Sequence, residues 1–168
     1  MTGERLRVYI ETSFVSYLTG GPTSDAKIAS DQAFTRKWWE TEQDKCDCFV
    51  SPYTIDESSV GNTDSVERRM AVISGLSALS VNPDEVDALA ERLLAEHAVP
   101  EKEYTDALHI AAAAVAGMDI LLTWNCRHMA NPHTLPKTRD IITANGYTCP
   151  AIMTPKTFIE NVNMEAKL

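Results

Sequence analysis

The chain has 168 residues with a formal net charge of −9, and 44% of its residues are hydrophobic. This length predicts a single domain, residues 1–168, with a sizeable core, and no apolar run approaches the roughly 20 residues that a membrane-spanning helix needs. The acidic charge argues against a broad phosphate-binding surface, but it is compatible with a nuclease whose acids hold a metal and with a basic protein partner.

The N-terminus and the cysteines indicate a reducing location. The opening stretch MTGERLRVYIE contains no apolar signal-peptide core, so we expect a cytoplasmic protein. The spacing of the cysteines does not form a disulfide framework, and no second ligand pair completes a zinc site with Cys126 and His128. We therefore expect reduced and mostly buried thiols. The four cysteines are Cys46, Cys48, Cys126 and Cys149.

The N-terminal part of the chain predicts two buried strands and the helices around them. A short apolar and β-branched run predicts a strand over 7–10, which is followed directly by Glu11. Thr12 and Ser13 then look like the cap of a short helix that begins near Phe14. The other elements expected here are a long helix opened by Ser24-Asp25, a strand over 48–51, a helix ending near Gly61, and a helix capped by Asp64.

The C-terminal part continues the alternation of strands and helices. A short strand is expected over 79–81, and Asn82 with Pro83 opens a helix that Pro100 ends. The remaining expected elements are the helix DALHIAAAAVAG up to Gly117, a strand over 119–123, a helix over 135–145, a weak strand over 151–153, and a last helix from Thr154-Pro155. Strands that alternate with helices predict an α/β fold with a parallel sheet covered on both faces.

Polar residues recur at comparable structural places. Glu11 ends the first strand, Glu57 lies on the helix after the second, Asp106 lies near the start of the alanine-rich helix, and Asn125 follows the third strong strand. Because the carboxyl ends of parallel strands share one edge, these four side chains could converge. Two carboxylates about 5 Å apart repel by roughly 3 kcal/mol at an effective dielectric near 20. A hard cation such as Mg²⁺ or Mn²⁺ would remove that repulsion, and such a site suits phosphodiester hydrolysis.

Ordinary structural roles also explain these residues. Glu57 fits a solvated helix face, and Asp106 fits a favourable charge at a helix N-terminus. Glu11 fits a carboxylate that accepts hydrogen bonds from the helix start after it. His109, three residues after Asp106, fits either a hydrogen bond to that carboxylate or a half-buried packing role. His128 fits either contact with RNA phosphate or ordinary solvation.

Three segments together carry a resemblance to a known family. They are VYIETSFVSYL, SPYTIDESSVGN and TDALHIAAAAVAGMDILLTWNCRHMANP. With them the chain resembles the PIN-domain proteins, specifically the VapC-like toxins of type II bacterial toxin–antitoxin systems, from about Arg7 to Phe158. The resemblance implies a three-layer α/β/α sandwich around a parallel sheet and a Mg²⁺- or Mn²⁺-dependent endoribonuclease. It also implies an RNA substrate, a cognate antitoxin protein and a homodimer.

The resemblance also implies which residues form the site. The family's acidic quartet, which is catalytic and binds the metal, matches Glu11, Glu57, Asp106 and Asn125. The hydroxyl positions beside it match Thr12, Ser13 and Thr123.

The chain departs from the family pattern at two of these positions. The family commonly has Asp where Glu11 stands and often has an acid where Asn125 stands. A site with three charges should hold a second metal ion less well than one with four. The alternative function is therefore a catalytically weak PIN module that binds RNA or a protein partner without cleavage, and a third is an α/β protein that binds another ligand at the same edge.

Overall fold

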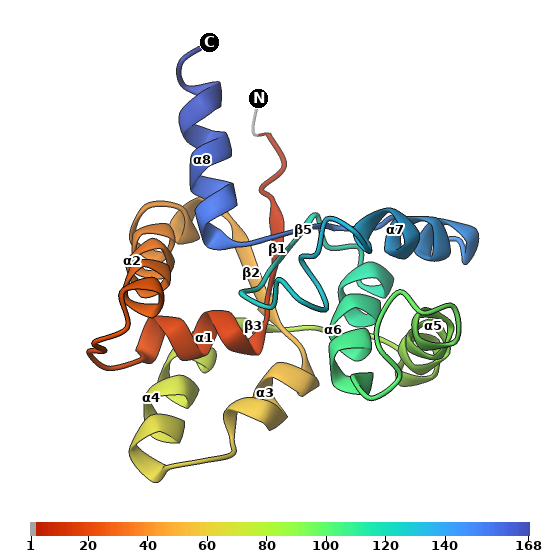
Figure 1. Ribbon diagram of the computed structural model, residues 1–168, viewed down its shortest axis with the longest axis horizontal. Coiled ribbons are helices and arrows are strands. Elements are labelled where there is room, and N and C mark those ends of the chain that lie inside the picture. Colours follow the sequence, from red (N-terminus) through yellow and green to blue (C-terminus); the bar gives the residue numbers. More distant parts are fainter. Residues whose placement is uncertain (1–2) are drawn as a thin grey trace.

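The computed structural model describes residues 3–168, and within them it contains a five-stranded sheet with helices on both faces (Figure 1). The strand order is β3-β2-β1-β4-β5, and every neighbouring pair is parallel. This confirms the predicted α/β/α sandwich with a central parallel sheet. The strands are β1 (Arg7–Ile10), β2 (Asp47–Val50), β3 (Ser77–Ala78), β4 (Ile120–Leu122) and β5 (Ala151–Met153).

Each face of the sheet has its own hydrophobic core, because successive strand residues point to opposite faces. Tyr9 and Leu121 belong to the core under α5 (Pro83–Ala95), α6 (Tyr104–Val115) and α7 (Leu135–Ala144). Val8 and Ile10 belong to the opposite core. The helices on that face are α1 (Thr12–Thr19), α2 (Ala26–Thr41) and α8 (Pro155–Glu165).

The remaining helices are the 3₁₀ helix η1 (Gln43–Lys45), α3 (Pro52–Ser58) and α4 (Thr63–Ile73). The starts of α4 and of α1 differ from the predicted ones. The cap of α4 is Asn62 rather than Asp64, because the Asn62 side chain accepts hydrogen bonds from the backbone amides of Asp64 and Ser65. Similarly, α1 begins at Thr12 and its cap is Glu11 rather than Thr12 or Ser13. In both cases the true cap is the residue that still has an extended backbone.

Two element boundaries also differ from the predicted ones. The third strand lies at Ser77–Ala78 rather than 79–81, because it pairs with Phe49 and Val50, where β2 ends. Helix α5 ends at Ala95 rather than near Pro100. His97 has a φ of +61° just after this helix. The left-handed turn there stops the helix before the proline is reached.

The four cysteines differ in their burial. Within the described part of the chain the four cysteines are free thiols. Cys46 and Cys48 are buried, but Cys126 is exposed and Cys149 is half-buried, so only two of the four are buried as expected. No helix within residues 3–168 is long and apolar enough to cross a membrane.

Candidate metal-binding active site

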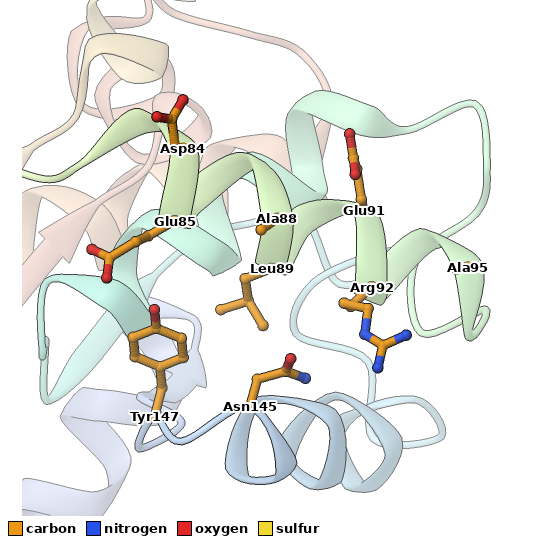
Figure 2. A pocket seen from close by; sticks show the side chains of 9 residues that line it. All are labelled: Asp84, Glu85, Ala88, Leu89, Glu91, Arg92, Ala95, Asn145 and Tyr147. Carbon is orange, nitrogen blue, oxygen red and sulfur yellow. The ribbon is translucent and has the colours of Figure 1, made fainter.

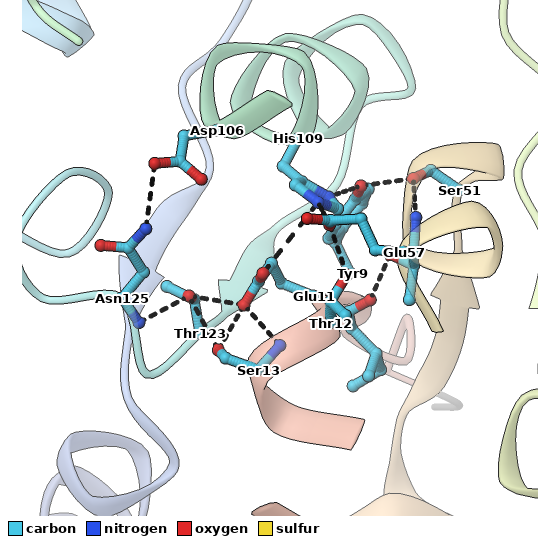
Figure 3. A network of polar contacts seen from close by, with 12 residues as sticks. Tyr9, Glu11, Thr12, Ser13, Ser51, Glu57, Asp106, His109, Thr123 and Asn125 are labelled. Atoms are coloured by element: carbon cyan, nitrogen blue, oxygen red, sulfur yellow. Dashed lines mark hydrogen bonds and ion pairs between the residues drawn. The ribbon is translucent and has the colours of Figure 1, made fainter. Parts of the chain in front are cut away.

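The predicted site residues lie at the carboxyl edge of the sheet (Figure 3). Ile10 of β1 and Leu122 of β4 are paired neighbours, so Glu11 and Thr123 follow them side by side. The Glu11 backbone amide also donates to the Leu122 carbonyl at 3.2 Å. Glu57 comes from α3, Asp106 from the first turn of α6, and Asn125 from the loop after β4.

Glu11 is buried, and one of its two oxygens is held by hydrogen bonds. Its side chain is only 7% exposed. Its Oε2 accepts from the Ser13 amide at 3.0 Å, from the Ser13 hydroxyl, and from the Thr123 hydroxyl at 2.8 Å. No described residue donates a hydrogen bond to its Oε1. Glu11 therefore caps α1 through Oε2, while its Oε1 stays open for another ligand.

Glu57 is also held through one oxygen. Its Oε1 accepts from the Thr12 hydroxyl at 2.6 Å and bonds His109 Nε2 at 2.5 Å. Burial alone would raise the pKa of the Glu57 carboxyl, but the hydrogen bonds from His109 and Thr12 outweigh burial and lower that pKa. Glu57 is therefore ionised at neutral pH, and its Oε2 has no hydrogen-bond partner among residues 3–168.

His109 differs from both of its expected roles. Its side chain is fully buried rather than half-buried, and its Nε2 bonds Glu57 rather than Asp106. Its Nδ1 lies 2.6 Å from the hydroxyl of Tyr9, which is also fully buried. Tyr9 was not among the predicted site residues, although the alternation of side chains along β1 directs it away from the face of Val8 and Ile10.

Asp106 lies on the opposite side of Glu11 from Glu57 in Figure 3. Its Oδ2 accepts from Asn125 Nδ2 at 3.1 Å and lies 3.0 Å from His128 Nδ1. Burial raises the pKa of the Asp106 carboxyl, and the hydrogen bonds from His128 and Asn125 offset only part of that rise. Its Oδ1 has no hydrogen-bond partner in the described chain.

The side-chain oxygen of Asn125 already accepts a hydrogen bond from the protein, unlike that of a simple oxygen ligand. Its Oδ1 accepts from the His128 backbone amide at 2.9 Å, while its Nδ2 points at Asp106. Its own backbone amide donates to the Thr123 hydroxyl at 2.9 Å. Thr123 therefore connects the loop that carries Asn125 to Glu11.

The ligand-type atoms form two groups rather than one. Glu11, Glu57 and His109 each offer an atom within 4.8 Å of the others, and so do Glu103, Asp106 and His128. Among the described residues the three predicted acids do not form one such group. The first group lies between β1, α3 and α6, and the second lies around the start of α6.

The three acids share a feature that fits a hard cation. In Glu11, Glu57 and Asp106, protein donors occupy one carboxylate oxygen and leave the other without a protein partner within residues 3–168. Fixed carboxylates with open oxygens are the ligands that Mg²⁺ and Mn²⁺ prefer. The carboxylates therefore fit a hard cation in their chemistry, with Glu11 and Glu57 in one ligand group and Asp106 in the other.

A hollow in the surface lies away from these residues. A groove of about 650 Å³ runs along α5 beside the turn after α7, and Figure 2 shows its lining. Glu85, Glu91 and Arg92 come from α5, while Asn145 and Tyr147 come from the turn. None of the predicted site residues lines this groove, so the candidate site rests on the carboxylates and not on the hollow.

Comparison with known proteins supports the fold. No protein-family model matches the chain, and no curated protein matches it. The parallel sheet with helices on both faces is an α/β/α sandwich. A solved structure with this fold is VapC20 from Mycobacterium tuberculosis, described as a toxin that cleaves the sarcin-ricin loop.

The similarity to VapC20 extends over most of both chains. The TM-score is 0.52 and the identity is 16%, with 84% of this chain and 96% of the VapC20 chain covered. At this identity the likeness establishes the fold. It therefore confirms the PIN-like, VapC-like architecture that the sequence motifs predicted.

Proposed function

We propose that the protein is a metal-dependent endoribonuclease and the toxin of a toxin–antitoxin pair. The observation that carries this proposal is the shared state of Glu11, Glu57 and Asp106, whose carboxylates are each fixed through one oxygen and open at the other. Carboxylates that lie near one another repel, and a cation bound to the open oxygens would remove that repulsion. The VapC-like fold supports the same function, because VapC20 is described as a toxin that cleaves the sarcin-ricin loop.

The chain's own residues would prepare the site before substrate arrives. Glu11, Glu57 and Asp106 would hold Mg²⁺ or Mn²⁺, which when bound activates water and stabilises charge on the scissile phosphate. Ser13 and Thr123 fix Glu11 Oε2 and leave Oε1 open. In this geometry Asn125 would act mainly by orienting Asp106, since its Oδ1 already accepts a backbone hydrogen bond.

The proposed partners follow from the same function. RNA is the substrate, and the antitoxin would supply a basic segment that suits the net charge of −9. Pairing as a homodimer is part of the proposal. The competing function is a PIN module that binds RNA or a protein without cutting, and the neutral Asn125 is the observation that favours it.

The metal requirement gives the direct test. We expect the purified protein to cleave a mixed RNA pool in Mn²⁺ or Mg²⁺, to stop in EDTA, and to recover when Mn²⁺ is restored. The cleavage products should carry a 5′ phosphate. Retained RNA binding without cleavage in any divalent ion would replace the nuclease with the binding module.

Asn125→Asp tests how the fourth position contributes. The variant loses the Nδ2 donor to Asp106, and hydrogen bonds to charged groups contribute about 1.5–3 kcal/mol, so the metal-free protein should unfold at lower denaturant concentration. The added charge should tighten Mn²⁺ binding, which calorimetry measures. Unchanged or weaker Mn²⁺ affinity would remove Asn125 from the neighbourhood of the ion.

A further inference from the structure

A buried line of hydrogen bonds leads from the sheet to Glu57 (Figure 3). The Thr54 amide donates to Ser51 Oγ at 3.3 Å, and Ser51 Oγ lies 2.5 Å from the Tyr9 hydroxyl. The Tyr9 hydroxyl lies 2.6 Å from His109 Nδ1, and His109 Nε2 lies 2.5 Å from Glu57 Oε1. Ser51, Tyr9 and His109 are fully buried, so water does not compete for these bonds.

Counting protons fixes the direction of this line. A carboxylate oxygen can only accept, so a hydrogen bond between His109 Nε2 and Glu57 Oε1 places a proton on Nε2. Burial raises the pKa of Tyr9 far above its ordinary value, so its hydroxyl keeps its single proton. If that proton goes to His109 Nδ1, the Ser51 hydroxyl donates to Tyr9, and each of these groups has a partner.

The opposite direction leaves a group unsatisfied. If Nδ1 also carried a proton, His109 would donate to Tyr9 and Tyr9 would donate to Ser51. Ser51 Oγ would then accept two hydrogen bonds, and its own buried proton would have no acceptor among the hydrogen bonds of the described chain. An unsatisfied buried donor is costly, so the first arrangement is favoured.

We propose that His109 is a positioning residue for Glu57, held by Tyr9 and Ser51 as the neutral Nε2–H tautomer. This inference rests on the proposed nuclease function. His109 and Thr12 both bind the same oxygen, Glu57 Oε1, and the other oxygen is therefore kept open. Because 40% of the Glu57 side chain is exposed, the carboxylate would otherwise rotate freely at the surface of α3.

A positioning role and a metal-ligand role require different protonation of His109 Nε2. His109 Nε2 lies 4.0 Å from Glu11 Oε1. His109, Glu11 and Glu57 each offer a ligand atom within 4.8 Å of the others, so a metal ion could take His109 as a ligand. A ligand nitrogen cannot carry a proton, whereas a positioning nitrogen must. The two roles therefore predict opposite tautomers in the presence of metal.

Nitrogen NMR of the unmodified protein distinguishes these roles. With ¹⁵N-labelled histidine, we expect His109 to show a protonated Nε2 and an unprotonated Nδ1, both without metal and with saturating Mg²⁺. A His109→Gln sample assigns the signal. An imidazolium or an Nδ1–H tautomer in the metal-free protein overturns the proposal, and so does a change to Nδ1–H when Mg²⁺ is added.

Two tyrosine variants test the orienting hydroxyl with a matched control. Tyr9 and Tyr53 both pack edge-on against the His109 ring, with centroids 5.8 Å and 6.2 Å away, but only the Tyr9 hydroxyl is hydrogen-bonded to it. Mutating a residue in the shell that orients a metal ligand typically costs about 10- to 100-fold in metal affinity. We expect a loss of that size in Mn²⁺ affinity for Tyr9→Phe and little change for Tyr53→Phe. Equal affinity in the two variants overturns the proposal.

Replacing His109 itself provides a rescue. A Gln side chain can place an N–H near Nε2, so His109→Gln should keep more Mn²⁺ affinity than His109→Leu, and equal losses would count against positioning. If the unmodified protein binds no divalent ion, the proposed nuclease function fails first. If it binds Mn²⁺ and cleaves RNA but His109→Gln and His109→Leu behave alike, only the role of His109 fails.

Discussion

Asp106→Asn is expected to abolish RNA cleavage and to weaken Mn²⁺ binding by at least about tenfold, or ~1.4 kcal/mol. The change keeps the shape of the side chain and removes one charge. Asp106 Oδ2 accepts both local hydrogen bonds, so the Asn oxygen can take over that position. The new amide nitrogen would then occupy the open Oδ1 position, where the metal is expected. Calorimetry and a cleavage assay measure the two losses.

The same variant should be more stable than the parent without metal. Burial raises the pKa of Asp106 above its ordinary value of 3.8, so the folded protein holds this proton more tightly than the unfolded chain. By linkage, the parent loses stability as pH rises from the ordinary pKa through the raised one. Asp106→Asn removes that loss. At pH values above the raised pKa, urea unfolding in EDTA should therefore give a larger free energy of unfolding for the variant than for the parent. This difference should shrink at acidic pH.

A matched control separates the metal site from the helix dipole. Asp84 lies in the first turn of α5, as Asp106 does in α6, but it lies outside the candidate site. A charge in a first turn contributes about 0.3–1 kcal/mol to helix stability. Asp84→Asn should lose a little stability and keep full Mn²⁺ response. If Asp106→Asn behaves like Asp84→Asn and still cleaves RNA, Asp106 is only a helix-start residue.

The edge of the sheet was predictable because it depends on local patterns. The apolar run before Glu11 and the run before Thr123 each predict a buried strand, and parallel strands bring their carboxyl ends together. The register then follows, with Ile10 opposite Leu122. The fold class and the edge of the sheet at which Glu11 and Thr123 lie are therefore predictable from the sequence alone.

The partners of the acids were not predictable in the same way. The spacing of Asp106 and His109 places both on one face of α6, so a hydrogen bond between them is one of the two roles that the sequence predicts for His109. The imidazole instead reaches Glu57, and that choice depends on where α3 packs after β2. The orientation of Asn125 likewise depends on the loop that brings the His128 amide to its Oδ1. Such contacts are set by tertiary structure and leave no periodic signal.

Glu11→Gln is expected to have the largest effect, because Glu11 lies between the other two acids. The Gln oxygen can accept the hydrogen bonds of Ser13 and Thr123, so the start of α1 should remain capped. The amide nitrogen would replace the open oxygen and present protons to the metal. We expect a loss of roughly 100-fold in Mn²⁺ affinity, about 2.8 kcal/mol, and no detectable cleavage.

Without metal, Glu11→Gln should be as stable as the parent or more so, since repulsion between Glu11 and Glu57 disappears. Added Mn²⁺ should raise the melting temperature of the parent but not of the variant, because only binding to the folded state stabilises it. Asp25 provides the control, as it caps α2 with its side chain away from the site. Asp25→Asn should keep the Mn²⁺-dependent rise. A Glu11→Gln protein that still gains stability from Mn²⁺ would show that the Glu11 carboxylate caps its helix without binding the ion.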